Sequence, residues 1–194
     1  MPRLIPPVVP PGTMSGGPQP DVPVAAGLVL RPWGEADAPA ALEAFSDPDI
    51  QRWHFQRLDS IDEAHDWIAG LRCGWEAETS ANWAIVDTET DLPIGRVGLT
   101  RVELVGGWGE VSYWLLPAAR GRGAASQSVI ALADWAFAHL ALKRLELKHS
   151  VDNPASCRVA GRAGFAAEGT MSQALFHDDG WHDMHLHARL RPDG

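Results

Sequence analysis

Residues 110–125 combine, in one short stretch, the features of a strand, a glycine-containing turn and the beginning of a helix. Residues 111–116 are rich in strand-forming side chains, and Pro117 lacks the N–H that would continue a strand ladder. Beyond Ala124 the apolar residues recur at steps of three and four, which is the period of a helix. These helical positions are Val129, Leu132, Ala133, Ala136, Phe137 and Leu140. The stretch therefore predicts a strand that is joined by a tight turn to a helix.

The turn itself offers a place for an anion. Gly121 and Gly123 carry no Cβ, so a ligand can approach the backbone, and the first amides of the helix have no partner within it. These amides and the helix dipole favour a phosphate, and Arg120 and Arg122 add formal positive charge. The spacing matches neither common nucleotide fingerprint, because no Lys-Ser/Thr pair follows and G-x-G-x-x-G is not completed. A plain structural loop is the alternative explanation for these four residues.

The pattern as a whole resembles the acyl-CoA signature of the GNAT N-acetyltransferases, R/Q-x-x-G-x-G/A, with Arg120, Gly123 and Ala125 at its specified positions. Further matches resemble the RimJ/RimL branch of this family, whose members acetylate protein N-termini, ribosomal ones among them. The matching segments are residues 30–33 with Asp37, 94–99, 135–137, 151–156, 163–165 and 168–169. The resemblance covers roughly residues 28–191 and implies a mixed α/β GNAT fold. Such a fold has a mostly antiparallel sheet, one parallel and splayed strand pair, and helices on both faces.

The length and composition indicate one domain preceded by a tail. At 194 residues the chain can bury one substantial core, and we expect residues 28–191 to form a single GNAT domain. Residues 1–27 hold eight prolines and four glycines with almost no charge, which predicts a disordered segment. Met14 is an alternative start to Met1, and the sequence does not decide between them. The apolar runs are short and the N-terminus lacks a signal pattern, so a cytoplasmic protein is expected.

The remaining elements follow from periodicity, caps and turns. Strands are expected over residues 28–31, 83–87, 92–102, 111–116 and 144–150, with a closing hairpin over 165–175 and 181–190. Helices are expected over residues 35–45, 60–78, 121–140 and 155–163, with a short turn or helix at 50–55. Ser60 with Glu63 forms a capping-box pair, and Asn153 before Pro154 is a helix start. The strand, helix and strand from 111 to 150 imply a parallel pair with a right-handed crossover.

The resemblance implies acetyl-CoA as co-substrate. Its pantetheine arm would pair with backbone groups of Trp114, Leu115 and Leu116, as an added strand would. Its pyrophosphate would meet the amides from residue 120 to residue 125, which are those of Arg120, Gly121, Arg122, Gly123, Ala124 and Ala125. Asn153 matches the family asparagine that contacts the pantetheine arm, and helix capping is its alternative role.

Acetyl transfer to an amine requires a neutral nucleophile, a polarised thioester carbonyl and a stabilised leaving thiolate. Ser156 matches the serine of the branch's N-x-x-S element and is the candidate for hydrogen-bonding or protonating the sulfur. Its alternative is to satisfy backbone amides at the helix start. Glu110, at the beginning of the cofactor strand, is the candidate base, and an ion pair that stabilises the fold is its alternative. A water chain near His54 or His149 is the alternative to a dedicated base.

The acceptor is expected to be a primary amine, with a protein or peptide N-terminal α-amine favoured by the branch. A small amine such as an aminoglycoside or polyamine is the enzymatic alternative, and a non-catalytic acyl-CoA-binding module is the third. The resemblance places Trp53, His54 and Phe55 in the loop over the acceptor pocket, as substrate contacts or as anchors of that loop. The net charge of -9 argues against a general nucleic-acid binder and suits a cationic acceptor. No membrane partner is expected, and either a monomer or a homodimer fits.

The histidines near the C-terminus invite a metal interpretation, since His185 and His187 would share one face of a strand. The whole polar run consists of His177, Asp178, Asp179, His182, Asp183, His185 and His187. The resemblance places it on the last hairpin, where the family has no metal. The two cysteines, Cys73 and Cys157, form no evident disulfide framework and lack metal-ligand spacing. We therefore expect no metal.

Overall fold

The computed structural model describes residues 4–25, 27–54 and 56–192. Its centre is one eight-stranded sheet with the order β1-β2-β3-β4-β5-β6-β8-β7. The strands are β1 (Val22–Val24), β2 (Leu28–Pro32), β3 (Ala81–Asp87), β4 (Leu92–Glu103), β5 (Trp108–Leu115), β6 (Arg144–Ser150), β7 (Ala166–His177) and β8 (Gly180–Leu190). Within the described ranges β5 and β6 are parallel, and the other neighbours in the sheet are antiparallel. The predicted mixed sheet with one parallel pair is confirmed.

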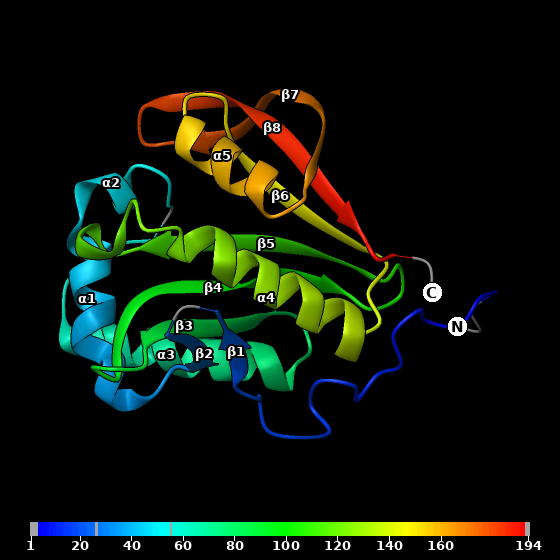
Figure 1. The fold of residues 1–194 in the computed structure, drawn as a ribbon, viewed down its shortest axis with the longest axis horizontal. Coiled ribbons are helices and arrows are strands. Elements are labelled where there is room, and N and C mark those ends of the chain that lie inside the picture. Colours follow the sequence, from blue (N-terminus) through cyan, green and yellow to red (C-terminus); the bar gives the residue numbers. More distant parts are fainter. Residues whose placement is uncertain (1–3, 26, 55, 193–194) are drawn as a thin grey trace.

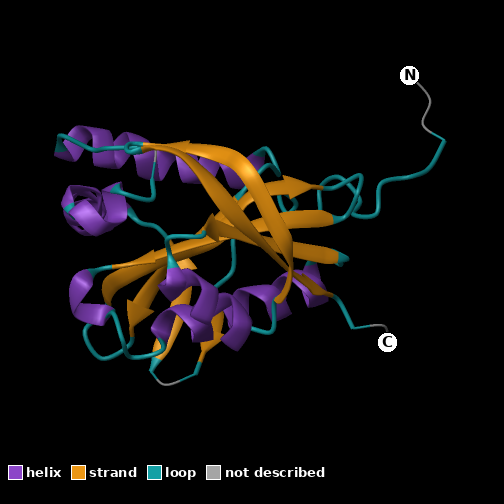
Figure 2. Ribbon diagram, turned by 90° about the horizontal axis from the view of Figure 1, so that it is seen from above, coloured by secondary structure: helices purple, strands orange, loops and turns teal. Residues whose placement is uncertain are grey.

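Helices cover both faces of this sheet (Figures 1 and 2). They are η1 (Glu35–Asp37), α1 (Ala38–Ser46), α2 (Pro48–Gln51), α3 (Ile61–Glu76), η2 (Pro117–Ala119), α4 (Ala124–His139) and α5 (Pro154–Arg162). One apolar cluster joins the sheet to α4 through residues such as Leu132 and Leu147, and a second joins it to α1 and α3 through Phe45 and Ile68. Among the described residues, no helix combines the length and apolar character needed to cross a bilayer.

Local chemistry determines where the helices begin. The Ser60 hydroxyl accepts the Glu63 N–H at 3.2 Å, while the Glu63 carboxylate accepts the N–H of Asp59, one residue before the expected partner, at 2.6 Å. The predicted helix over residues 121–140 begins at Ala124. Gly121 and Gly123 have φ angles of +81° and +83°, and this left-handed backbone cannot continue a right-handed helix.

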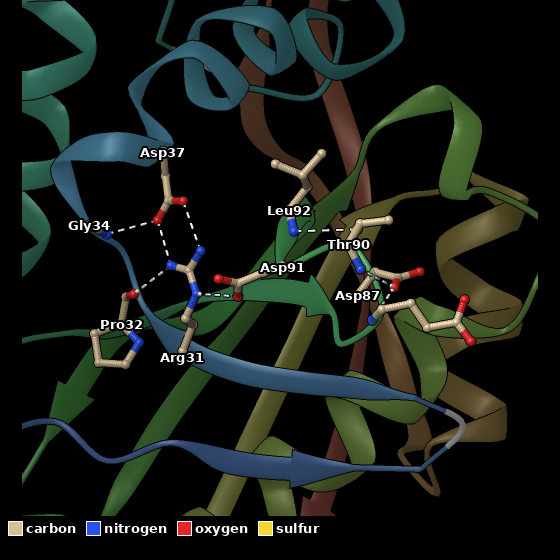
Figure 3. Close-up of polar contacts among 9 residues, drawn as sticks. Arg31, Pro32, Gly34, Asp37, Asp87, Thr90, Asp91 and Leu92 are labelled. Carbon is tan, nitrogen blue, oxygen red and sulfur yellow. Dashed lines mark hydrogen bonds and ion pairs between the residues drawn. The ribbon is translucent and has the colours of Figure 1, made fainter.

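A partly buried ion pair connects β2 to the first helices (Figure 3). The Arg31 guanidinium donates to both carboxylate oxygens of Asp37, at 2.6 and 2.9 Å, and Asp37 also accepts the Gly34 N–H at 2.8 Å. Such a two-point contact holds both partners in one orientation. Arg31 and Asp37 belong to the segments that resemble the RimJ/RimL branch, and their contact joins β2 to the start of the helices.

Residues 8–24 contact the domain, whereas the sequence predicted a disordered tail over residues 1–27. β1 pairs with β2, and the Val9 N–H donates to the Leu104 carbonyl at 3.0 Å. The side chains of Val9 and Met14 are buried, and the Glu78 carboxylate accepts the amides of Gly12 and Met14 at 2.7 and 2.6 Å. Val9, Met14 and Val22 belong to the apolar cluster that joins the sheet to α4, so the disorder expected from the composition is wrong for this part of the segment. The composition does not reveal that the domain supplies partners for the segment's backbone.

Candidate active site

The parallel strands β5 and β6 separate part-way along their length. Their pairing extends from Trp108 and Arg144 to Val111 and Leu147, although both strands continue beyond that point. A cavity of about 1160 Å³ lies there, lined from both strands, from α5 and from the loop after α2. Figure 1 shows β6, α5, β7 and β8 diverging from β5 toward the end where α2 lies. The separation exposes a strand edge to the cavity.

The register decides which backbone groups face this edge. Leu116 N–H donates to the Ile94 carbonyl of β4 at 2.9 Å, and Trp114 is aligned with Arg96 of β4. Because successive residues of a strand direct their backbone groups to opposite edges, Tyr113 and Leu115 face the side where β6 departs. Among the three predicted pantetheine contacts, Leu115 therefore has its groups on the open side, while Trp114 and Leu116 face β4.

The turn after β5 leads directly into the N-terminus of α4. The first bond within α4 runs from the Gln127 N–H to the Gly123 carbonyl at 3.1 Å, so the amides of Ala124, Ala125 and Ser126 have no partner inside the helix. A Cβ at Gly121 would meet no atom within 4 Å, and this part of the turn is open. The predicted anion site is thus a row of free amides beside the cavity.

Arg120 is engaged by protein groups. Its guanidinium contacts Asp47 at 2.6 Å and Asp49 at 2.7 Å, and its Nε donates to the Leu115 carbonyl at 3.1 Å. These contacts hold Asp47 and the first turn of α2 against the end of β5. Arg122, in contrast, is exposed at the turn. Of the two predicted phosphate partners, Arg122 has the side chain that projects into solvent.

Ser156 and Tyr113 meet across the cavity. The Tyr113 hydroxyl donates to Ser156 Oγ at 2.9 Å, and Asn153 Oδ1 accepts the Ser156 N–H at 3.0 Å. Asn153 therefore has the capping role that was its alternative. Burial raises the pKa of Tyr113 to about 12, so its hydroxyl keeps the proton. Sequence reasoning did not single out Tyr113, although it is the one tyrosine of the chain and lies on the cofactor strand.

Glu110 lines the cavity but is also ion-paired. Its carboxylate lies 2.9 Å from Lys148 Nζ, and Lys148 also contacts Glu146 at 3.3 Å. Partial burial would lower the pKa of Lys148, but the two carboxylates outweigh this effect and raise it. The stabilising alternative for Glu110 is present in the structure, with a lysine as its partner.

The loop after α2 reaches the β7–β8 hairpin over the cavity. The Trp53 ring packs edge-on against His177 and His182, with ring centroids 5.7 and 6.0 Å apart. His54 packs edge-on against Phe45, and burial lowers its pKa to about 4, so it is neutral at physiological pH. Trp53 and His54 both line the cavity, and both also anchor the loop. Phe55, the third predicted contact, lies outside the described residues.

Comparison with known proteins identifies the family. Residues 27–166 match the family described as the acetyltransferase (GNAT) domain. The chain belongs to the GNAT acetyltransferases. It is similar to the uncharacterized N-acetyltransferase YoaA of Bacillus subtilis, with 25% identity over 85% of this chain and 94% of YoaA. It is also similar to the ribosomal-protein-serine acetyltransferase of Escherichia coli, with 38% identity over 52% of this chain and 56% of that protein.

Solved structures agree with this family assignment. One of them is RimL, a ribosomal L7/L12 alpha-N-protein acetyltransferase solved in complex with coenzyme A. It is 26% identical to this chain and superposes with a TM-score of 0.82, and the match covers 88% of this chain and 98% of the RimL chain. The predicted fold and enzyme class of this GNAT acetyltransferase are confirmed. RimL combines this fold with a bound coenzyme A.

Two polar groups of this GNAT site escaped sequence reasoning. The first surrounds Arg96, whose guanidinium donates to Ser112 Oγ at 3.0 Å and to Asn82 Oδ1. Burial lowers the pKa of Arg96 to about 10, which still leaves it cationic at neutral pH. Among the described residues, no carboxylate forms an ion pair with Arg96. A buried cation that lines the cavity is a potential partner for a carbonyl or carboxylate of the acceptor.

The second group is a chain of three side chains. Ser150 Oγ lies 2.7 Å from His182 Nδ1, and His182 Nε2 lies 2.6 Å from Asp179 Oδ1. Ser150 lines the cavity and ends β6, while the other two residues belong to the β7–β8 hairpin and its turn. The arrangement can pass a proton from the cavity toward a carboxylate. The sequence contained the histidine and the aspartate, but not their distance from Ser150.

Proposed function

We propose that this GNAT acetyltransferase moves the acetyl group of acetyl-CoA to the α-amine of a protein or peptide N-terminus. The observation that carries the proposal is the separation of β5 and β6 beside the free amides at the start of α4. The open edge of β5 could pair with an extended amide chain, and the amides at the start of α4, which follow in the sequence, could bind a diphosphate. The RimL complex with coenzyme A supports the same ligand class for this chain.

The residues of the splay and the turn fit such a coenzyme. Backbone groups of Tyr113 and Leu115 would pair with the pantetheine amides, and the amides of Ala124 and Ala125 would receive the diphosphate. Gly121 leaves the turn open, and Arg122 would add positive charge at its rim. Arg120 would not contact the coenzyme directly, and would instead hold the turn and α2 together through its ion pairs.

Ser156 is positioned to assist the leaving group. In the reaction the amine nitrogen forms a bond to the carbonyl carbon, the C–S bond breaks, and the sulfur leaves as a thiolate that receives a proton. Since Tyr113 keeps its proton and donates to Ser156 Oγ, the Ser156 O–H is free to donate elsewhere. Thiols ionise near pH 8.5, so one hydroxyl donor gives the leaving group sufficient help.

A base must take the proton that the amine loses. Glu110 remains our candidate, because its carboxylate lines the cavity and is only partly covered by Lys148. The chain from Ser150 to His182 offers a second route through water. His54 is a poor base, because a pKa of about 4 makes its protonation at neutral pH unfavourable. Glu110→Gln and His182→Gln separate the two routes, since the variant that lacks the true base should lose most of its kcat while the other variant keeps it.

The choice of acceptor is supported by the relatives and by charge. RimL is named for the α-amine of ribosomal L7/L12, and the E. coli relative is named for a ribosomal-protein serine. The net charge of -9 attracts a cationic amine over the range where charges are not screened. The aromatic side chains of Trp53 and Trp67 at the cavity provide apolar surface for the first side chain of a peptide.

Purified protein should be incubated with acetyl-CoA and short peptides that differ in their first residue, while thiol release is followed. The matched control peptides carry the same sequence with a blocked N-terminus and an internal lysine. Spermidine and an aminoglycoside test the small-amine alternative. Mass spectrometry of α-amine acetylation would support the proposal. Acetylation confined to lysine or to the small amines, or tight coenzyme binding without turnover, would overturn it.

A further inference from the structure

Four potential metal ligands converge under α5, next to the cavity. His149 lies on β6 directly opposite His185 of β8, and His187 lies opposite Leu147, one pleat away on the same face. α5 contributes Cys157. One ligand atom from each of these four residues lies within 4.8 Å of all the others. Three separate elements therefore contribute three imidazoles and one thiol to a single point.

The hydrogen bonds orient these rings as ligands. His149 Nδ1 lies 2.8 Å from the Ser150 carbonyl, so Nδ1 carries the proton and Nε2 has a free lone pair. This backbone contact is the arrangement that metal-bound histidines use to fix their tautomer. His149 Nε2 lies 3.2 Å from His187 Nε2. In a tetrahedral site with Zn–N bonds of about 2.0–2.1 Å, two nitrogens are about 3.3 Å apart.

Burial favours the ligand form of the cluster. His149 and His187 are 5% and 4% exposed, and Nδ1 of His187 is buried without a hydrogen-bond partner among the described residues. A hydrogen bond between the two Nε2 atoms accounts for that pair alone. It does not explain why His185 and Cys157 point to the same place.

We propose that His149, Cys157, His185 and His187 bind one Zn²⁺ ion in a tetrahedral site. Imidazole and thiolate suit zinc, whereas Ca²⁺ and Mg²⁺ require oxygen ligands. The longer separations, up to 4.8 Å, mean that binding would draw the ligands inward. The site would fasten α5 to β6 and β8. Because Cys157 follows Ser156 directly, the metal would also fix the first turn of α5, where Ser156 and its cap Asn153 lie. This inference departs from the absence of metal expected from the family resemblance.

Metal binding is testable without any acetyl-transfer assay, so its outcome is independent of the proposed function. Full-length protein, prepared without a polyhistidine tag and treated with a chelator, is kept reduced by a phosphine and titrated with Co²⁺. We expect one equivalent to bind, with the visible absorption of four-coordinate cobalt and a thiolate-to-cobalt charge-transfer band. Zn²⁺ should displace the cobalt and raise the melting temperature.

Matched variants assign the ligands. Cys157→Ser should abolish the charge-transfer band and weaken binding at least about tenfold, since changes to outer-shell partners alone cost that much. Cys73→Ser is the control, because Cys73 is the other free cysteine and is exposed on α3. His187→Ala should lose affinity, while His65→Ala, at an exposed position of α3, should not.

Two results would overturn the proposal. The first is the absence of stoichiometric cobalt or zinc binding by the parent protein. The second is binding that survives unchanged in Cys157→Ser. If His187→Ala fails to fold, Cys157→Ser still decides, because replacing sulfur by oxygen preserves the size of a half-buried side chain.

Discussion

Tyr113 is predicted to act on the reaction only through Ser156. The structure shows one hydrogen bond between their hydroxyls, 2.9 Å long, and Tyr113 donates it. Tyr113→Phe removes this donor and keeps the ring, so the surrounding packing is preserved. Ser156→Ala removes the group that would contact the sulfur. The two substitutions therefore perturb successive members of one chain.

The size of each effect follows from the type of hydrogen bond. A bond between neutral groups contributes about 0.5–1.5 kcal/mol, which corresponds to a 2- to 13-fold decrease in kcat for Tyr113→Phe. A bond to a group that develops charge is worth about 1.5–3 kcal/mol, so Ser156→Ala should lower kcat by about 10- to 150-fold. The KM for acetyl-CoA should change little in either variant, because the affected interaction strengthens in the transition state.

The assay is a double-mutant cycle on kcat, with thermal melting to verify that each variant is folded. If Tyr113 acts only by orienting Ser156, the double variant should be no slower than Ser156→Ala alone. Because the pKa of Tyr113 is about 12, the parent's rate should show no tyrosine inflection at neutral or mildly alkaline pH. Additive losses in the double variant would refute the reasoning and give Tyr113 an independent role.

Three further predictions concern the turn and the N-terminal segment. Gly123→Ala should lower the free energy of unfolding by about 1–2 kcal/mol, because φ is +83° at this position and a side chain disfavours that conformation. An added Cβ would meet only Gln127 Nε2, at 3.7 Å, so the cost comes from the backbone and not from a clash. A shift of this backbone should also raise the KM for acetyl-CoA. Gly161→Ala, at an open helical position, is the control and should not destabilise. Arg122→Ala should weaken acetyl-CoA binding by about 1 kcal/mol in calorimetry and leave the melting temperature unchanged. Arg120→Ala should instead lower the melting temperature. The reverse pattern would exchange the roles of the two arginines. Glu78→Gln should cost about 1 kcal/mol at pH 7 in denaturant unfolding, since burial would raise the pKa of Glu78 but the amides of the N-terminal segment hold it below 4.5. That difference should be fully present above pH 4.5 and disappear as the pH falls through the lower folded-state pKa. A difference that persists in acid would exclude the amide contacts as its cause.

Features that depend on neighbouring residues were predictable from the sequence. The strand, turn and helix of residues 110–125, the free amides at the start of α4 and the cap at Asn153 all arise within a few residues of the chain. The parallel pair and the closing hairpin followed from the same local patterns together with the family resemblance, whereas the position of β8 between β6 and β7 did not. Hydrophobic periodicity and caps act locally, which is why they are legible without coordinates.

Features that depend on partners distant in the chain appeared only in the tertiary structure. Arg120 meets Asp47 and Asp49, which lie 73 and 71 residues away, and Tyr113 meets Ser156 across 43 residues. The composition of residues 1–27 predicted disorder because it does not reveal the Glu78 carboxylate, which accepts the Met14 N–H across 64 residues.

The histidines illustrate this division most clearly. The alternation of His185 and His187 was visible in the sequence, and it indicated two side chains on one strand face. His149 and Cys157 joined them only when β6 paired with β8 and α5 packed above both strands. The spacing of residues along a strand or helix specifies which side chains lie on the same face of that element. The distance between side chains of different elements is set by how the helices and strands pack together.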